Sequence, residues 1–315
     1  MISFGPISSR RLGLSLGINN IVQGKFCSYS CVYCQIGNTN DKTTERQTFY
    51  EPGKLVKDVE NHLEKLDSSH LPDYLTFVAN GEPTLDINLG EEIRLLKKFG
   101  IPVAVITNTS IINHKSVRQD LMQADWVSVK VDTVSKLVWK KINRPSDKLD
   151  LVTILDGVKI FASEYDGRLN TETMLIKGYN DELSQLKETA LFISGLNPNT
   201  SWLSVPIRPP ALQEVIPVSE EKITGAWHLF RKNNINTELL TGFEGTNTGF
   251  TGDACNDILN ITAVHPLRED TMEKLLEKDK SDRSVVDSLV KRGLIKSLFF
   301  DGKKYYVRRY QKNYD

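Results

Sequence analysis

Three cysteines stand close together in the sequence, at Cys27, Cys31 and Cys34, and only one other cysteine, Cys255, occurs among the 315 residues. Three thiolates in one loop can bind three corners of a cubane iron–sulfur cluster. The fourth iron then lacks a protein ligand and can bind a substrate or cofactor. A cluster that only transfers electrons normally has four protein ligands, so three ligands indicate a cluster that takes part in chemistry.

Other uses of the three cysteines fit the sequence less well. A structural zinc site needs a fourth ligand, which Cys255 could supply, but zinc sites usually pair their cysteines as C-x2-C. A disulfide framework is typical of small secreted chains that are richer in cysteine. Buried inert thiols usually occur singly, and the flanking residues Ser28, Tyr29 and Ser30 are not a core pattern. The spacing therefore favours an iron–sulfur cluster.

The composition limits the classes of protein and partner. The 40 basic and 40 acidic residues cancel, so no overall charge directs the chain to nucleic acid or to a membrane. Apolar residues make up 39% of the chain, which is enough to fill a sizeable core. The amino-terminal segment has no long apolar stretch, and no run of about 18 apolar residues occurs anywhere. We therefore expect a cytoplasmic protein without a membrane anchor.

Strand and helix patterns alternate along most of the chain. The predicted strands are residues 12–18, 74–79, 103–107, 126–131, 173–176, 202–205 and 237–240, and the predicted helices between them are 52–66, 89–96, 116–123, 151–162, 182–194 and 220–232. About six βα units of this kind are typical of a parallel sheet with helices outside, either doubly wound or closed as a barrel. The cysteine loop follows the first strand, and barrel enzymes carry their chemistry at the carboxyl ends of strands. We therefore expect an α/β fold with a partial (β/α)6 TIM-type barrel.

The pattern changes after residue 265. Two helical segments precede two apolar strands joined by the dipeptide Asp301-Gly302, which is a strong hairpin signal. The predicted elements are helices at 268–279 and 283–292 and strands at 294–300 and 303–310. Two helices followed by a hairpin predict a small winged-helix-like module.

These patterns divide the chain into three parts. Residues 1–241 are expected to form the partial barrel, and residues 266–315 the winged-helix-like module. The segment 242–265 begins with a stretch rich in Gly and Thr. We expect it to link the two parts and to close the open side of the barrel.

The cysteine run and a later glycine-containing segment resemble the radical S-adenosylmethionine (radical SAM) superfamily. The run CSYSCVYC, with Tyr33 directly before the third cysteine, is similar to the signature of that family. Gly81, Glu82 and Pro83 follow the second predicted strand and resemble the family's GGEP-type segment. The resemblance implies that this segment binds the amino group of the methionine part of the cofactor.

Further segments fall after successive strands, where the family contacts its cofactor. Thr107-Asn108 resembles the T-N turn of glycyl-radical-activating enzymes. Lys130 and Asp132 stand where an acid and a lysine contact the cofactor in those enzymes, although in reversed order. The alternative for these two residues is an ordinary ion pair at a strand end. Lys177-Gly178 begins a turn that resembles one lining the adenine side of the cofactor.

The resemblance implies that Cys27, Cys31 and Cys34 hold a [4Fe-4S] cluster, whose open iron binds S-adenosylmethionine. Reductive cleavage of this cofactor gives a 5′-deoxyadenosyl radical, which takes a hydrogen atom from a substrate. An external one-electron donor of the flavodoxin or ferredoxin type is also implied. Tyr33 is expected either near the adenine or in loop packing. Cys255 is a candidate catalytic residue, with simple packing as the alternative.

Two features of the sequence bear on the identity of the substrate. Residues 9–19 and 142–145 resemble iron–sulfur oxidoreductases associated with wyosine-type tRNA base formation, although those carry further cysteines that are absent here. Residues 283–315 contain nine Lys or Arg against three Asp, interleaved with aromatic residues, as in surfaces that bind a phosphate backbone. Three functions follow: radical modification of an RNA base, radical activation or modification of a protein or peptide, and an iron–sulfur winged-helix redox sensor.

Overall fold

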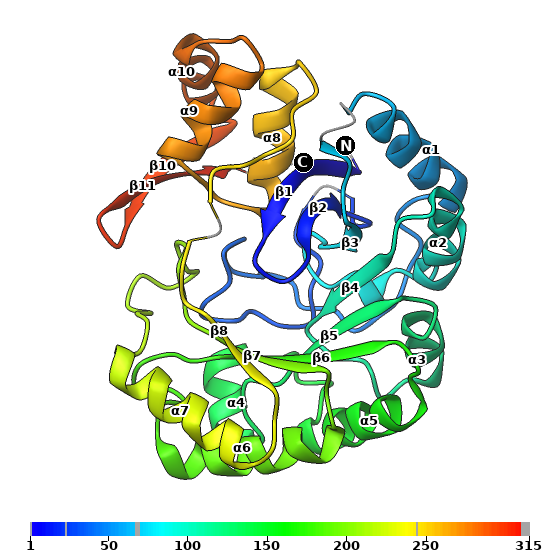
Figure 1. Cartoon of the computed structure of the whole chain (residues 1–315), viewed down its shortest axis with the longest axis vertical. Coiled ribbons are helices and arrows are strands. Elements are labelled where there is room, and N and C mark those ends of the chain that lie inside the picture. Colours follow the sequence, from blue (N-terminus) through cyan, green and yellow to red (C-terminus); the bar gives the residue numbers. More distant parts are fainter. Residues whose placement is uncertain (1, 23, 67–69, 244, 310–315) are drawn as a thin grey trace.

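One curved sheet of eight strands forms the centre of the computed structural model, which describes residues 2–22, 24–66, 70–243 and 245–309. The strands lie side by side in chain order from β1 to β8. Neighbours from β2 onward are parallel, whereas β1 pairs antiparallel with β2. Helices cover the outer face, and β1 and β8 border an open side (Figure 1). The predicted α/β partial barrel is confirmed.

The elements of the barrel alternate as the sequence predicts. Its strands are β1 Ser3–Ser9, β2 Gly13–Ile18, β3 Tyr74–Phe77, β4 Val103–Thr107, β5 Trp126–Lys130, β6 Arg168–Met174, β7 Thr200–Ser204 and β8 Thr237–Leu240. Its helices are α1 Pro52–Leu63, α2 Leu89–Leu96, α3 Lys115–Leu121, α4 Lys136–Asn143, α5 Leu151–Glu164, α6 Leu183–Leu196 and α7 Glu220–Lys232, with short 3-10 helices η2 Pro83–Leu85 and η3 Lys97–Phe99.

Local signals explain where several helices begin and end. Pro52 opens α1, where its missing N–H costs nothing. The side chain of Asp150 accepts from two backbone N–H groups at the start of α5, and that of Ser219 accepts from the N–H of Lys222 in α7. Gly100 takes the left-handed conformation, with φ of 70°, and ends the turn that follows α2.

The structure adds elements that the sequence analysis did not predict. Strand β1 precedes the first predicted strand, and α4 lies between β5 and the helix predicted at 151–162. Strand β6 begins at Arg168, five residues before the predicted start at Thr173. Its polar sequence, RLNTETM, lacks the apolar run by which a buried strand is recognised.

The inner face of the sheet changes character along the strands. Trp126 on β5 packs near Trp202 on β7, with ring centroids 5.6 Å apart, in an apolar cluster that includes Leu12. Alternate residues of a strand face the same side, so Lys130 and Ser204 lie on this inner face, farther toward the carboxyl ends. Apolar side chains therefore fill one end of the lumen. Polar side chains line the other end, at the carboxyl ends of the strands, where the cysteine loop begins.

The C-terminal part packs against β1. It consists of α8 Ala254–Val264, β9 Leu267–Arg268, α9 Glu269–Lys278, α10 Arg283–Lys291, β10 Ile295–Phe300 and β11 Lys303–Arg308. Its core gathers apolar residues of α8, α9, α10 and the hairpin around Phe4 of β1. The helices and the hairpin around Asp301-Gly302 lie where the sequence predicts them, except that Tyr310 is outside the described residues. The winged-helix assignment itself stays a prediction.

The segment between β8 and α9 does more than join two parts. Residues 247–249 run antiparallel beside β1, with the N–H of Ser8 donating to the carbonyl of Asn247 at 3.1 Å and an isolated bridge between Ile7 and Thr248. Its end forms the helix α8, which the sequence analysis included in the linking segment. Among the described residues, no helix is both long and apolar enough to cross a membrane.

Candidate functional site

Each cysteine of the loop after β2 receives an N–H group, two from asparagines of other loops and one from a lysine of the same loop. The side-chain amide of Asn108 lies 3.3 Å from the sulfur of Cys27, and that of Asn143 lies 3.5 Å from the sulfur of Cys31. The ammonium group of Lys25 lies 3.2 Å from the sulfur of Cys34. Donors of this kind stabilise negative charge on sulfur, as bound thiolates require.

The thiol of Cys27 is buried, and those of Cys31 and Cys34 are partly buried and close enough to interact. Burial raises the pKa of the Cys27 thiol to about 12. Burial and the neighbouring Cys34 raise the pKa of the Cys31 thiol to about 12. Without a cation the thiols of Cys27 and Cys31 therefore stay protonated at neutral pH, and binding a metal is what would convert them to thiolates.

Among the described residues, no three His, Cys, Asp or Glu side chains come together as a site for a single metal ion. A cubane cluster binds each cysteine to a different iron, so its three cysteines do not have to converge on one point.

Gly81 lets two loops of the site meet at close range. A β-type bridge joins it to Phe26, and the N–H of Glu82 donates to the carbonyl of Phe26 at 2.9 Å. Gly81 has φ of 145°, and a methyl group at its α-carbon would overlap the carbonyl oxygen of Phe26. Only glycine therefore allows the segment after β3 to lie against the residue before Cys27.

Glu82 joins two segments that the sequence analysis assigns to cofactor binding. Its side chain is 1% exposed and accepts hydrogen bonds from the Thr107 hydroxyl at 2.6 Å and from the N–H of Asn108 at 2.7 Å. It also accepts from the hydroxyl and N–H of Thr84. Its carboxylate thus locks the segment after β3 to the turn after β4. Direct contact between Glu82 and a cofactor stays a prediction.

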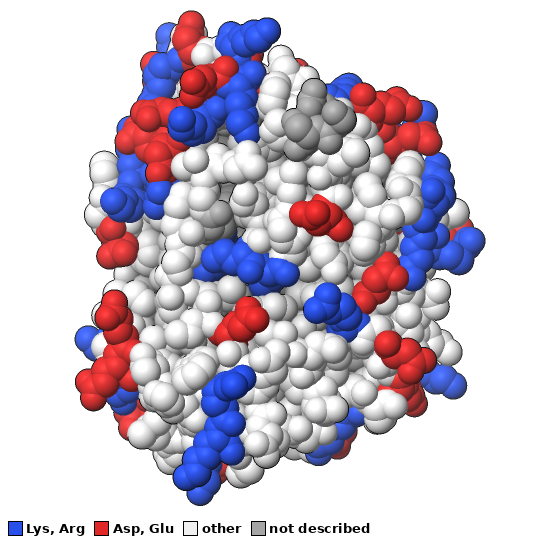
Figure 2. All heavy atoms as spheres, in the orientation of Figure 1, with Lys and Arg blue, Asp and Glu red and all other residues white. Residues whose placement is uncertain are grey.

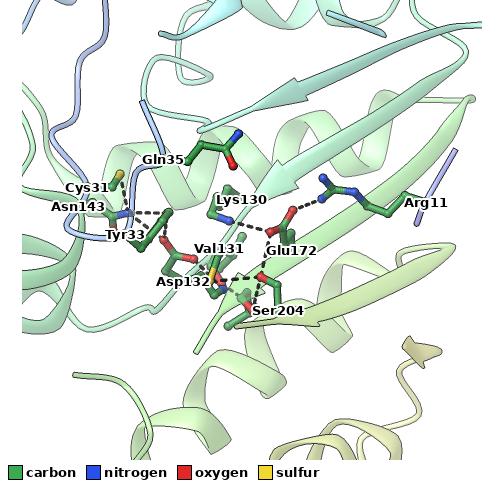
Figure 3. A network of polar contacts seen from close by, with 12 residues as sticks. Arg11, Cys31, Tyr33, Gln35, Lys130, Val131, Asp132, Asn143, Glu172 and Ser204 are labelled. Atoms are coloured by element: carbon green, nitrogen blue, oxygen red, sulfur yellow. Dashed lines mark hydrogen bonds and ion pairs between the residues drawn. The ribbon is translucent and has the colours of Figure 1, made fainter. Parts of the chain in front are cut away.

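Asp132 fixes the aromatic residue of the cysteine loop. One carboxylate oxygen accepts from the hydroxyl of Tyr33 at 2.6 Å and from the amide of Asn143 at 2.8 Å, and the other accepts from the N–H of Met174. The same Asn143 amide reaches the sulfur of Cys31. Asp132 therefore orients both the tyrosine and a donor to the cluster loop (Figure 3).

Lys130 forms its ion pair with Glu172 and not with Asp132, the partner that a strand-end pair would have used. Its ammonium group lies 3.0 Å from Glu172 on β6 and 5.0 Å from the centre of the Tyr33 ring. Arg11, from the turn between β1 and β2, reaches across the lumen to the same Glu172 (Figure 3). Arg11 and Lys130 together hold the pKa of Glu172 well below its usual range, so the carboxylate stays charged.

The turn after β6 is connected to this network through its asparagine. Gly178, with φ of 76°, donates its N–H to the carboxylate of Asp181, and Lys177 is exposed. The amide of Asn180 donates to the carbonyl of Asp132 at 2.9 Å. The structure therefore brings this turn beside the other predicted segments, and its role at an adenine group stays a prediction.

Cys255 lies in a different environment from the other three cysteines. It belongs to α8 and packs, partly buried, against the C-terminal apolar core. The link between that helix and the cysteine loop is Gln35, whose amide donates to the carbonyl of Val264 at 2.7 Å. This setting favours packing for Cys255, and its catalytic role stays a prediction.

Sequence reasoning missed several residues of the site. Asn143 lies within the segment 142–145, but the sequence of that segment predicts no role for it. Lys25 stands two residues before the first cysteine, so its nearness was the available signal. Glu172 and Arg11 are 161 positions apart, and no local pattern connects them.

Comparison with known proteins places this geometry in a family. Residues 21–193 match the model of the Radical SAM superfamily. The chain is 45% identical to the UPF0026 protein MJ1312 of Methanocaldococcus jannaschii over 98% of this chain and 96% of that protein. It is 26% identical to a probable dual-specificity RNA methyltransferase RlmN of Thermotoga neapolitana over 58% of this chain and 55% of that protein.

Solved structures share the fold at low sequence identity. TYW1 with a lysine-pyruvate adduct superposes with a TM-score of 0.55 at 16% identity, covering 71% of this chain and 75% of that one. Streptococcus suis SuiB bound to the precursor peptide SuiA superposes with a TM-score of 0.53 at 14% identity, covering 75% of this chain and 51% of that one. These similarities concern the barrel architecture.

Proposed function

Because this chain belongs to the radical SAM superfamily, whose cofactors are a [4Fe-4S] cluster and S-adenosylmethionine, we propose that Cys27, Cys31 and Cys34 hold the cluster. The reduced cluster and the sulfonium cofactor together supply a 5′-deoxyadenosyl radical that abstracts hydrogen from a substrate. One observation carries this proposal: the three thiols of the loop each receive an N–H donor from Asn108, Asn143 or Lys25. A flavodoxin- or ferredoxin-type protein is the proposed electron donor.

The surrounding residues would position the cofactor rather than react. The segment Gly81-Glu82-Pro83 and the turn Thr107-Asn108 form one unit through Glu82, beside the cysteine loop. We assign the methionine end of the cofactor to this unit. Tyr33, held by Asp132, and the turn at Lys177-Gly178 would border the adenine. Positioning and exclusion of water are what a protein contributes when a cofactor carries the chemistry.

Anaerobic reconstitution of the Cys31→Ala variant tests the proposal. We expect loss of cluster binding and of 5′-deoxyadenosine formation when dithionite and S-adenosylmethionine are supplied. The same substitution at Cys255 is the matched control and should leave both quantities unchanged. Full cofactor cleavage by the Cys31→Ala protein would refute the cluster assignment, whereas loss of cleavage in the Cys255→Ala protein alone would give that residue a catalytic role.

The substrate that we propose first is a base in RNA. The hairpin β10–β11 carries Lys296 and Lys303 on one face and Phe299, which is 75% exposed, on the opposite face near its tip. Basic groups with an exposed aromatic ring can hold a phosphate backbone and a stacked base. A sequence similarity to a probable RNA methyltransferase adds support.

Charge reversal tests this substrate better than removal of the C-terminal part. Deleting residues 266–315 would strip the apolar core that covers Phe4 and α8, so a loss of binding would be ambiguous. Lys303→Glu with Lys296→Glu should weaken tRNA binding by about tenfold in 0.1 M salt and reduce its salt dependence. Lys187→Glu, on the outer helix α6, is the control. Equal tRNA binding by the double variant, the control variant and the unsubstituted protein would contradict the RNA proposal.

Modification or activation of a peptide or protein is the second candidate. The specific observation is the fold shared with SuiB, which is bound to a precursor peptide in one solved structure. A redox sensor would bind the cluster without consuming the cofactor. Measuring 5′-deoxyadenosine with tRNA, with peptide and without either separates the three functions, because only the sensor gives none in every mixture.

A further inference from the structure

A cavity of about 120 Å³ opens beside the cysteine loop, between the β1–β2 hairpin and the loop after β7. Its wall includes Arg10, Arg11, Arg208 and His265. None of the described residues that line it is Asp or Glu. Arginine is charged at every accessible pH, so the wall presents guanidinium groups to a partly enclosed space, with the charge of Arg11 already balanced by Glu172.

Different parts of the chain hold the three guanidinium groups in place. Arg10 donates to the carbonyl of Gly242 at 2.9 Å, across the open side of the barrel. Arg208 donates to the amide oxygen of Gln35 at 2.9 Å. Arg11 pairs with Glu172. All three arginines are half-buried, so their positions are set by the fold rather than by chance on the surface.

The rest of the wall combines hydroxyl groups with apolar side chains. Ser15 on β2 and Thr76 on β3 contribute hydroxyls that hydrogen bond to each other at 2.7 Å. Phe4, Val78 and Ile106 contribute apolar surface. A ligand with one anionic end and a short carbon body would satisfy both kinds of wall.

The cavity connects the cluster loop to the outside. Gln35, which directly follows Cys34, lies in its wall. A second cavity of about 190 Å³ shares Arg208 and is lined by Arg268, Lys303 and Asp301 near the hairpin β10–β11, where Arg268 pairs with Asp270. Figure 2 shows Lys and Arg side chains near the middle of one face of the molecule, with Asp and Glu side chains close to them. Arg208 therefore lies between the loop that we assign to the cluster and the surface near the hairpin β10–β11.

We propose that the cavity lined by Arg10, Arg11 and Arg208 binds the anionic group of the substrate, either a carboxylate or a phosphate. The planar guanidinium fork matches both groups with paired hydrogen bonds. At roughly 15 Å³ per water the first cavity holds about eight waters, which suits a phosphate or a small organic acid. Binding there would fix the end of the substrate that does not react and leave a C–H bond toward the cluster loop. That the bound molecule is the substrate rests on the proposed function. Binding of an anion in the cavity does not depend on it.

Phosphate binding to the reconstituted full-length protein tests the site without turnover. We would titrate inorganic phosphate and follow its phosphorus resonance, with acetate and neutral acetamide as competitors. Phosphate and acetate should compete, and acetamide should not. Arg10→Gln and Arg208→Gln should each weaken phosphate binding by about tenfold, the loss expected for one charged hydrogen-bonding partner. Arg94→Gln, on the surface of α2, is the matched control.

The arms of this experiment separate the alternatives. Arg208→Lys keeps a charge and should retain most of the binding, so a folding defect in Arg208→Gln would be recognised. A 5′-phosphorylated trinucleotide that competes better than phosphate would identify the anion as part of RNA, and equal competition would identify a free small acid. Unchanged phosphate affinity in both glutamine variants, or complete displacement by S-adenosylmethionine, would overturn the proposal. If the unsubstituted reconstituted protein binds phosphate but does not cleave the cofactor, that result would instead contradict the proposed function.

Discussion

The two sides of the lumen differ in the charged side chains that they carry and in how these side chains are bonded. On the side that joins the cysteine loop to β3, β4 and β5, acids are buried and bonded within the protein, as Glu82 and Asp132 are. On the open side, cations line a cavity without described acids in its wall. The first region is satisfied by its own chain and is therefore preorganised. The arginines of the second region can bind the anionic group of a ligand.

The closed side depends most on the contact at Gly81. In Gly81→Ala the new methyl group would overlap the carbonyl of Phe26, and the φ of 145° is unfavourable for alanine. We expect a loss of stability of about 3 kcal/mol and failure to retain iron, because the two loops must separate. Iron content after anaerobic reconstitution and urea unfolding measure these effects.

Gly178 offers the matched control for this substitution. It also has a positive φ, of 76°, but nothing lies within 4 Å of the position that a methyl group would take. Gly178→Ala should therefore cost about 1 kcal/mol, from the backbone alone, and retain its iron. If Gly81→Ala behaves like Gly178→Ala, the contact between the two loops is not essential.

Glu172 stands at the border between the two regions, because it pairs with Arg11 from one side and Lys130 from the other. Glu172→Gln would leave two half-buried cations without their shared anion. We expect a loss of about 3–5 kcal/mol in the free energy of unfolding at pH 7. Glu188→Gln, exposed on α6, is the control. A loss below 1 kcal/mol, measured by urea unfolding, would mean that solvent replaces the carboxylate.

The order of the elements was predictable, and the network between them was not. Strands β4 and β8 and helix α7 have their predicted bounds, because such signals lie within a few residues. Helix α8 was missed because the Gly- and Thr-rich stretch before it suggested a linker, although Ile258 and Ile261 have helical spacing.

The candidate site shows the same division. The motifs located the three cysteines, Gly81 and Glu82, but not what Glu82 bonds. Its partners are supplied by the turn after β4, and a sequence motif does not state which atoms meet across two loops. The arginines of the open side come from segments about 200 residues apart, and only the curvature of the sheet brings them together.

Lys25 is the exception on the closed side, since it places a cation beside the cysteines. Its ammonium group lies 3.2 Å from the sulfur of Cys34 and also donates to the carbonyl of Gly37. A nearby positive charge favours the reduced, more negative form of a cluster. Lys25→Met should lower the midpoint potential by on the order of 60 mV, a tenfold change for one electron.

Potentiometric titration followed by electron paramagnetic resonance measures this potential without turnover. Lys42→Met is the matched control, because Lys42 lies in the same loop region but donates to the carbonyl of Pro145. Its potential should equal that of the unsubstituted protein. An unchanged potential in Lys25→Met would show that the ammonium group does not act on the cluster.

The smallest expected effect concerns Glu92, a buried acid of α2 behind the closed side. Burial, together with the nearby charge of Asp86, raises the pKa of Glu92 to about 9. Between its ordinary value of 4.5 and about 9, the folded protein keeps a proton that the unfolded chain loses. The free energy of unfolding therefore decreases as pH rises through this window.

Glu92→Gln removes this titration, so its unfolding free energy should decrease less between pH 5.5 and 8.5. We expect a difference of about 1 kcal/mol, because water and structural relaxation reduce the cost of burying a charge. Urea unfolding at the two pH values measures it, with Glu91→Gln, the exposed neighbour on α2, as the control. Parallel pH dependence in Glu92→Gln and the unsubstituted protein would show that Glu92 is ionised in the fold. The closed side would then hold a buried negative charge with solvent access, and the contrast with the open side would be weaker than the structure indicates.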